Sequence, residues 1–213
     1  MENTKASRVL SVIGLLLILA AIVWTVRNTV IQANAGEAVQ AVVQQLYEQI
    51  PQAEPQTSEA SAATAVDLSR LPDYMLNPEM PMPVVEINGL DYIGYIELPS
   101  LELTLSVCST WDYDALNISP CRYSGSAYLN NLVIAGHNYS THFANLSQVQ
   151  PGDPVILTDI DGNVFRYRAV LVEVLEATDV EKMTESDFDL TLFTCTIGGA
   201  SRVALRCNRI MFP

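Results

Sequence analysis

The stretch TLFTCTIGGASRVALRC, residues 191 to 207, decides how the end of this chain folds. A run typical of a β-strand leads to Cys195, the pair Gly198-Gly199 follows, and a second apolar run carries two arginines. Glycine pairs favour tight hairpin turns because glycine accepts positive φ. With the glycines at the centre of the turn, Cys195 faces Arg202, and directly opposed residues have Cβ atoms about 4.5 to 5.5 Å apart.

A guanidinium this close to a thiol indicates a chemical role. Arg202 stays charged at any ordinary pH, so it can stabilise the Cys195 thiolate or an oxyanion that forms beside it. A chance pairing on a solvated face is the alternative. The same register puts Arg206 opposite Thr191, roughly 13 Å farther along the strand at about 3.3 Å per residue. We therefore expect only Arg202 to reach such an oxyanion.

A histidine stands at the end of another apolar run. His137 follows LVIAG, where Gly136 is expected to allow a sharp exit from the strand. A thiol nucleophile, a proton donor to a leaving amine and a cation for the oxyanion together make an acyl-transfer site. A purely structural role for His137 is the alternative. The other histidine, His142, is expected at the surface.

Charge and composition argue against other functions. The chain has 24 acidic and 11 basic residues, a net charge of -13, so a nucleic acid is not an expected partner. The four cysteines form no CxxC pair and only two histidines are present, so we expect no metal and no cofactor. Asp159, Asp161 and Asn163 are spaced like the start of a calcium loop, but the later glutamate is missing, which favours a hairpin turn.

The cysteines other than Cys195 have separate interpretations. In the alternation through SRVALRC, Cys207 points away from the two arginines, which indicates a core thiol. Cys108 and Cys121 bracket the loop-like stretch STWDYDALNISP and can form a disulfide outside the cell. Sequence does not fix the distance between them, so a disulfide and two free thiols both remain open.

The N-terminal region contains an uncharged apolar run, VLSVIGLLLILAAIVWTV, from Val9 to Val26. As a helix it is roughly 27 Å long, close to the roughly 30 Å of a bilayer core. Lys5 and Arg8 precede it and Arg27 follows, a slight bias toward a cytoplasmic N-terminus. We expect a single-pass anchor in the cell membrane with the rest of the chain outside. A signal peptide cleaved near residues 33–35 and a buried core helix are the alternatives.

The rest of the chain divides into segments that differ in composition and in the spacing of their apolar residues. Residues 36–50 have apolar side chains at helical spacing and predict an amphipathic helix that stands off the membrane. The polar stretch from Pro51 to about Arg70 cannot bury enough surface to fold alone and indicates a linker. We expect a cytoplasmic N-terminus at 1–8, a transmembrane signal anchor at 9–27, a stalk helix at 28–50, a linker and N-terminal extension at 51–83, and a β-domain at 84–213.

Short β-like runs separated by turn residues fill this last segment, which predicts a β-barrel or a β-sandwich. Helical spacing is weak there, apart from one short segment around residues 141–148. The runs lie at residues 91–98, 101–107, 131–137, 153–159 and 164–177, ahead of the terminal pair.

These runs also resemble the successive blocks of a known family. DYIGYIELPSLELTLSV, NLVIAGHN, the FANL and PGD blocks, and TLFTC followed by SRVALR are similar, in order from about Tyr92 to Ile210, to the sortases. Sortases are cysteine transpeptidases of Gram-positive cell surfaces. The resemblance implies a mainly β fold, a closed, mixed eight-stranded sortase-type β-barrel with short helices, preceded by the N-terminal transmembrane helix.

Carried over to this chain, the resemblance implies that Cys195 is the nucleophile, His137 the proton donor and Arg202 the oxyanion-side arginine. Thr194, beside the nucleophile, is a candidate for the substrate groove. The implied substrates are secreted proteins with a C-terminal sorting motif of the Leu-Pro-x-Thr-Gly kind. An amine of a peptidoglycan precursor or a pilin lysine then resolves the thioacyl intermediate.

The subclass stays open. AGHNYSTHF resembles class B sortases, whereas TLFTCT and YIGYIEL resemble the pilin-polymerising class C and class D groups. The link from Cys195 to Arg202 is short for a sortase, which leaves the sorting motif open as well. Two other functions remain: a hydrolytic membrane-anchored cysteine peptidase, in which water resolves the thioester, and a catalytically inactive β-barrel binding module.

Overall fold

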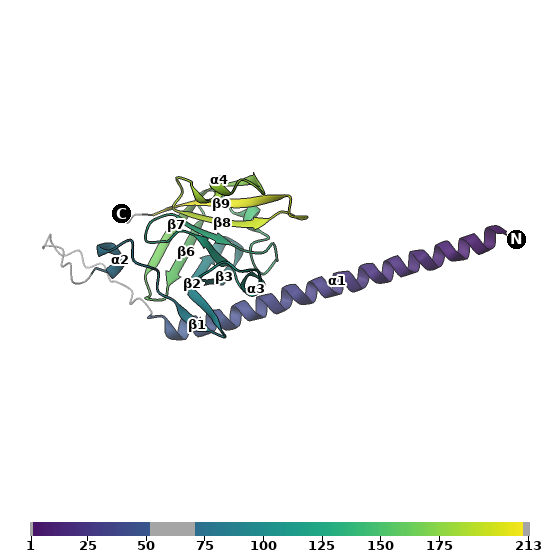
Figure 1. Cartoon of the computed structure of the whole chain (residues 1–213), viewed down its shortest axis with the longest axis horizontal. Coiled ribbons are helices and arrows are strands. Elements are labelled where there is room, and N and C mark those ends of the chain that lie inside the picture. Colours follow the sequence, from purple (N-terminus) through teal and green to yellow (C-terminus); the bar gives the residue numbers. More distant parts are fainter. Residues whose placement is uncertain (1, 52–70, 211–213) are drawn as a thin grey trace.

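The computed structural model describes residues 2–51 and 71–210 of the chain. Residues 52–70, most of the expected linker, lie outside these ranges. A β-barrel and one long helix make up most of the described structure (Figure 1).

Nine strands within the described ranges form one sheet that closes on itself. They are β1 (Val85–Ile87), β2 (Leu90–Leu98), β3 (Leu103–Cys108), β4 (Cys121–Ser124), β5 (Leu132–Ala135), β6 (Pro154–Asp159), β7 (Val164–Glu176), β8 (Leu190–Cys195) and β9 (Ser201–Arg209). The order is β1-β2-β3-β4-β5-β8-β9-β7-β6, and a β2–β6 pairing closes the ring. The eight strands β2 to β9 therefore form the barrel, and β1 extends it at β2. Because β3–β4 and β5–β8 are parallel and the other pairs antiparallel, the barrel is mixed, as the resemblance implied.

The short elements were harder to predict than the long strands. Each β-like run in the sequence corresponds to one strand, but β1 and β4, of three and four residues, were not predicted. The helices are α1 (Glu2–Gln49), α2 (Asp73–Leu76), α3 (Tyr113–Leu116) and α4 (Val180–Thr184), with 3₁₀ turns η2 (Pro99–Leu101) and η3 (Leu146–Gln148). The helix expected around residues 141–148 is only the turn η3.

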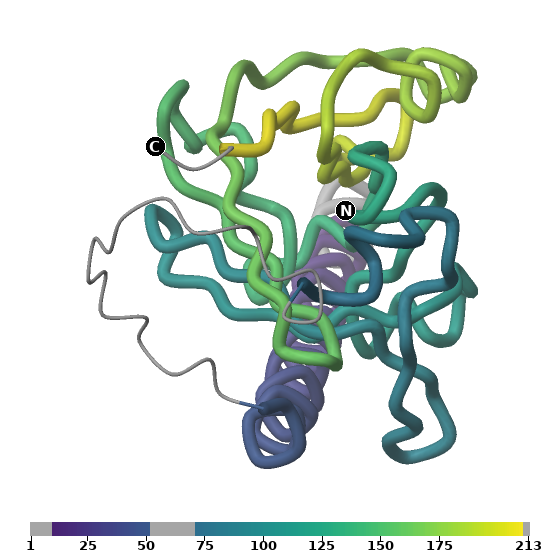
Figure 2. The backbone as a smooth tube through the Cα atoms, turned by 90° about the vertical axis from the view of Figure 1, so that its left-hand side faces the viewer, coloured from purple at the N-terminus to yellow at the C-terminus, as the bar shows by residue number. Residues whose placement is uncertain are grey.

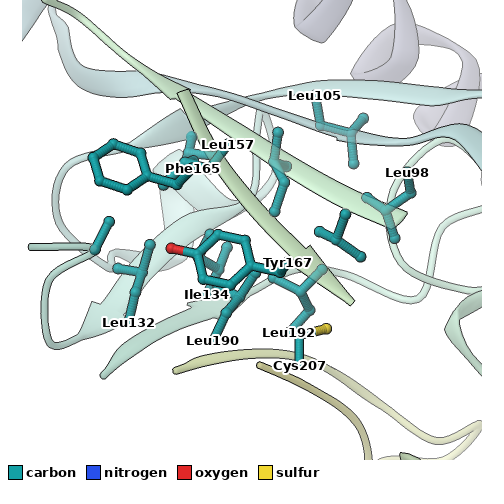
Figure 3. Close-up of a cluster of buried hydrophobic side chains, with 14 of the residues drawn as sticks. Leu98, Leu105, Leu132, Ile134, Leu157, Phe165, Tyr167, Leu190, Leu192 and Cys207 are labelled. Carbon is teal, nitrogen blue, oxygen red and sulfur yellow. The ribbon is translucent and has the colours of Figure 1, made fainter. Parts of the chain in front are cut away.

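Alternating residues of the strands fill the barrel interior, because successive side chains in a strand point to opposite faces. Cys207 is fully buried among them, which confirms the prediction of a core thiol. Figure 3 shows part of this cluster, with Leu98, Leu105, Leu132, Ile134, Leu157, Phe165, Tyr167, Leu190, Leu192 and Cys207 labelled.

The turn between β6 and β7 is the predicted hairpin turn. Gly162, at a φ of 83°, donates from its N–H to the carbonyl of Asp159. The buried Asp159 carboxylate accepts hydrogen bonds from the Tyr128 hydroxyl at 2.8 Å and from the Asn163 side chain at 2.9 Å. This carboxylate therefore stabilises the turn through Asn163 and links the turn to the rest of the barrel through Tyr128.

The helix α1 is continuous over 48 residues and joins two expected segments. Between Leu10 and Val26 its large apolar side chains are exposed, and the helix is long and apolar enough to cross a membrane. Its C-terminal part packs against the barrel, seen nearly end-on in Figure 2. The amphipathic helix expected at residues 36–50 is therefore the C-terminal part of α1, with its apolar face against the barrel. The buried apolar residues are Val39, Val42, Val43, Leu46 and, just past the helix, Ile50.

The same helix also contacts the loop that follows β5. The Thr141 hydroxyl donates to the carbonyl of Gln32 at 3.2 Å, and the Ser140 N–H donates to the Gln32 side chain at 3.3 Å. Gly36 allows this close approach, because a Cβ there would lie 2.7 Å from the Thr141 methyl group. The end of the barrel that carries His137 is thus attached to α1.

Candidate active site

The β8–β9 hairpin has the predicted register. Cys195 is the Cα partner of Arg202, and Thr191 is the partner of Arg206. Opposed residues in an antiparallel pair project to the same face of the sheet. The Cys195 and Arg202 side chains therefore leave the hairpin next to each other, as the sequence predicted.

The turn of this hairpin differs from the prediction. The Gly199 N–H donates to the carbonyl of Thr196 at 2.8 Å, so Ile197 and Gly198, rather than the two glycines, occupy the centre. Gly198 has a φ of 86° at the third position of the turn, where glycine is favoured. Thr196 still pairs with Ser201, and residues 197–200 form a four-residue loop between them. The pairing of Cys195 with Arg202 is therefore the same as for the predicted two-residue turn.

The two arginines have different environments. Arg206 is only 2% exposed, and its Nε donates to the Glu173 carboxylate at 2.7 Å. Its Nη1 donates to the Thr191 hydroxyl at 2.8 Å, and its Nη2 donates to the carbonyl of Lys182 at 2.7 Å. Arg206 thus connects β9 to β7, β8 and α4 as a structural group.

Arg202 is half-buried at the other end of β9, and its Nη1 bonds the carbonyls of Gly199 and Ser201 at 2.9 and 3.1 Å. These contacts direct the guanidinium over the β8–β9 loop. Cys195, the Cα partner of Arg202, is half-buried as well. Among the four cysteines Cys195 is the only one that is not buried. It is therefore the thiol that can meet a substrate.

His137 follows β5, and a packing contact explains the glycine before it. The Gly136 N–H donates to the carbonyl of Phe193 at 2.9 Å, which continues the β5–β8 pairing. Gly136 does not have the positive φ expected for a sharp exit. Glycine is needed because a Cβ there would lie 2.4 Å from the Phe143 ring. The backbone at Gly136, just before His137, therefore packs directly on the buried Phe143 ring.

The His137 ring is held on two sides. Its Nε2 lies 3.1 Å from Oδ1 of Asn117, and the ring stacks on Tyr139 with centroids 4.7 Å apart. Burial lowers the pKa of His137 below its ordinary value of 6.5, since the charged imidazole loses hydration. Asn117 was missed by the sequence analysis, and no pattern in the sequence joins positions 117 and 137. The contact depends on how the loop after α3 folds back to the end of β5.

His142 is fully buried, and the expectation of a surface residue is wrong. The turn that begins at Tyr139 directs the ring inward. The His142 N–H donates to the carbonyl of Tyr139 at 2.9 Å, and the two rings lie 5.4 Å apart. Burial, with a smaller contribution from nearby His137, lowers the pKa of His142 to about 4.

This burial predicts a stability that depends on pH. Between about pH 6.5 and pH 4 the unfolded chain binds a proton at His142 that the folded chain does not, so stability is lost as the pH falls through this window. The expected loss is about 3 kcal/mol. Urea unfolding at pH 7 and pH 4.5 should show a clearly smaller loss in His142→Leu and in His142→Gln. An equal loss in both variants would assign the pH dependence to other groups.

The three expected catalytic residues line one groove of about 400 Å³. His137 comes from the end of β5, Cys195 from the end of β8 and Arg202 from the start of β9. Glu176 and Asp179 also line the groove. The other walls are largely apolar, with Trp111, Tyr113, Leu116, Tyr123, Met183 and Phe193. An apolar groove that ends at a thiol, an imidazole and a guanidinium suits acyl transfer from an extended peptide.

Thr194 is not among the residues that line this groove. It is buried and paired with Val203, so its side chain points to the face of β8 opposite Cys195. The structure thus does not bring this predicted groove residue to the site. Within residues 2–51 and 71–210, no group of three or more His, Cys, Asp or Glu side chains is placed to hold a metal ion.

Comparisons with known proteins agree with this architecture. A family model described as Sortase domain matches residues 96–210. No curated protein matches the chain. Among solved structures, a Clostridium perfringens Sortase D5 transpeptidase is similar, with a TM-score of 0.50 and 22% identity over 60% of this chain and 83% of that chain.

Two class C sortases give similar values. Sortase C1 from Streptococcus suis has a TM-score of 0.50 and 25% identity, covering 57% of this chain and 74% of that chain. Sortase C of Streptococcus pneumoniae has a TM-score of 0.51 and 23% identity, covering 60% and 72%. These likenesses support the barrel fold. Since the family model covers more than half of the 213 residues, the chain belongs to the sortase family of cysteine transpeptidases.

Proposed function

We propose that this sortase uses Cys195 as nucleophile, His137 as proton donor and Arg202 as the oxyanion-side cation. One observation carries the proposal: three separate segments of the chain bring these side chains to the same groove. The buried environments of Arg206 and His142 leave Arg202 and His137 as the arginine and histidine for the reaction.

The first half of the proposed reaction forms a thioacyl intermediate. The Cys195 thiolate attacks a main-chain carbonyl of the sorting motif, and Arg202 stabilises the oxyanion that develops. Collapse of this intermediate breaks the C–N bond, and protonated His137 gives its proton to the departing amine. The carbonyl carbon is then held by Cys195 as a thioester.

The second half transfers the acyl group to an amine. Neutral His137 takes a proton from the incoming amine, which attacks the thioester and releases the Cys195 thiolate. One amide is exchanged for another, so the reaction needs no nucleotide. The proposed acceptor is an amine of a cell-wall precursor or a pilin lysine, and the donor is a secreted protein with a C-terminal sorting motif.

The anchor sets where this reaction takes place. The exposed apolar surface of α1 supports a single membrane crossing, with the barrel on the extracellular side. Because α1 is continuous into the part that packs on the barrel, the proposed stalk at 28–50 holds the groove close to the membrane surface. Newly secreted substrates emerge at this surface.

Product analysis tests the proposed function. The full chain in detergent is incubated with a library of sorting-motif peptides, with and without an added amine, and the products are identified by mass. We expect an amide with the added amine. Hydrolysed peptide alone, whatever the amine, would indicate a cysteine peptidase. A chain that forms no acyl-enzyme with any peptide would indicate a binding module.

The two arginines make a matched pair for a second test. Arg202→Ala should lower kcat/KM by about 10²- to 10³-fold, as for loss of a principal oxyanion donor, with little change in stability. Arg202→Lys should recover little because a point charge cannot reproduce the planar fork. Both variants are measured by steady-state kinetics and thermal melts.

Arg206→Ala should behave in the opposite way. It leaves the Thr191 hydroxyl and the carbonyl of Lys182 without their donor, so we expect a loss of stability of about 3 kcal/mol. Activity per folded molecule should change much less than in Arg202→Ala. If Arg206→Ala were inactive while folded and Arg202→Ala were active, the oxyanion role would move to Arg206.

A further inference from the structure

Cys108 and Cys121 lie side by side on adjacent strands of the barrel wall. They are Cα partners in the parallel β3–β4 pair, and both are buried. The Cys108 N–H donates to the carbonyl of Pro120 at 2.8 Å, which fixes the two strand ends together. Neighbouring strands lie about 4.7 to 4.9 Å apart, within the Cα separation of about 4.4 to 6.8 Å that a disulfide requires.

The two thiols also face each other. A hydrogen bond between them lowers the pKa of Cys108 and raises that of Cys121, and the Tyr92 hydroxyl assists in stabilising the Cys108 thiolate. Thiolate character on one member of a close pair favours attack on an external disulfide. The pair therefore has both the spacing and the asymmetry of an oxidisable dithiol.

The chain between these cysteines forms one wall of the groove. Trp111, Tyr113 and Leu116 line the groove, and Asn117 accepts the hydrogen bond of His137. The loop is held from within by the Asp112 carboxylate, which accepts from the N–H groups at the start of α3. A covalent bond at its base would restrict the wall and the partner of His137 together.

We propose that Cys108 and Cys121 form a reversible disulfide outside the cell, which fixes the loop of residues 109–120 and holds Asn117 against His137. The oxidant is a low-molecular-weight disulfide, which reaches the pair when the loop of residues 109–120 opens locally, since both thiols are buried in the closed fold. The Cys108 thiolate attacks it and forms a mixed disulfide with release of one thiol. The Cys121 thiolate then attacks the Cys108 sulfur and releases the second thiol, which takes the remaining proton and completes the two-electron transfer.

Thiol counting on the full chain in detergent tests the bond itself. Cys195 is first alkylated in the native chain, which protects it from glutathione. After oxidation with glutathione disulfide, followed by denaturation and a second alkylation, we expect two alkylated cysteines, Cys195 and Cys207, and four after reduction. A protease that cuts before Asp112 and Asp114 should release a disulfide-linked pair of peptides. Cys207→Ala is the matched control and should give one and three. Four alkylated cysteines after oxidation, with no linked peptides, would overturn the proposal.

Thermal melts test what the bond does to the fold. In a Cys195→Ala background, which removes the reactive groove thiol, oxidation should raise the melting temperature by about 5 to 10 °C, as expected for closing a loop of this length. The further double change Cys108→Ala and Cys121→Ala should remove the difference. An equal melting temperature for both redox forms would contradict a stabilising disulfide.

Kinetics test the connection to the groove, and this part rests on the proposed function. Asn117 contacts His137 with both thiols free, so the disulfide restricts the loop rather than creating the contact. With Cys195 kept reduced, opening the disulfide should lower kcat about two- to threefold through greater motion of Asn117, and the double alanine variant should not respond. A disulfide that forms without any change in kcat would refute the link to His137. A chain inactive in both redox forms would instead count against the transpeptidase proposal.

Discussion

Cys195→Ala should form no thioacyl intermediate with any sorting-motif peptide and should show no transpeptidation. The reaction requires a sulfur that attacks the carbonyl and holds the acyl group, and a methyl group supplies neither. The fold should persist because Cys195 is half-buried at the end of β8, where removing a sulfur leaves little cavity. The mass of the chain after mixing with peptide gives the acylated fraction directly, and a thermal melt reports the fold.

Cys207→Ala is the matched control for this variant. Cys207 is fully buried in the barrel core, so its loss should lower stability while acyl-enzyme formation continues. In a brief exposure, a methanethiosulfonate reagent should label the native wild-type chain once, at Cys195, because the other three cysteines are buried and react only after a local opening. Measurable transpeptidation by Cys195→Ala would remove Cys195 from the nucleophile position.

Local pattern was enough to predict the hairpin that carries the chemistry. The pairing of Cys195 with Arg202 depends only on the number of residues between two strands, so it survived an error in the turn type. The apolar face of residues 36–50 was predicted in the same way from helical spacing. The spacing of apolar residues could not show which surface this face packs on, because strands β2 and β3 form that surface only in the closed barrel.

Contacts between distant segments explain the remaining errors. His142 was expected at the surface, yet the turn at Tyr139 buries the ring. Asn117 reaches His137 only because β4 lies between β3 and β5, which brings the loop after α3 to the end of β5. The residues of β4, CRYS, form no apolar run, unlike the LVIA of the equally short β5, so β4 has no clear signal in a single sequence.

His137→Ala should lower kcat by about 10²- to 10⁴-fold, the range of a positioned proton transfer. The departing amine is a poor leaving group unless it is protonated, and His137 is the histidine that lines the groove. Burial lowers the pKa of His137, so an NMR titration of its ring should have a midpoint below pH 6.5. Protonated His137 is then the minor form at neutral pH. The rate of acylation should therefore rise as the fraction of protonated His137 rises, and His137→Ala removes this proton donor altogether.

Asn117→Ala tests the positioning of His137 apart from its role as proton donor. This variant keeps the imidazole but loses the contact at 3.1 Å, so kcat should fall about tenfold, with KM nearly unchanged. Normal turnover in Asn117→Ala would show that the contact does not orient His137 for the reaction.

The leaving group decides whether His137 acts as an acid. A peptide whose scissile amide is replaced by a thioester releases a thiolate, which departs without a proton. With this substrate, acylation of His137→Ala should approach the wild-type rate, whereas Cys195→Ala should remain inactive. If the histidine variant were equally slow with the amide and the thioester, His137 would serve Cys195 or the shape of the groove. The proton for the amine would then have to come from another group.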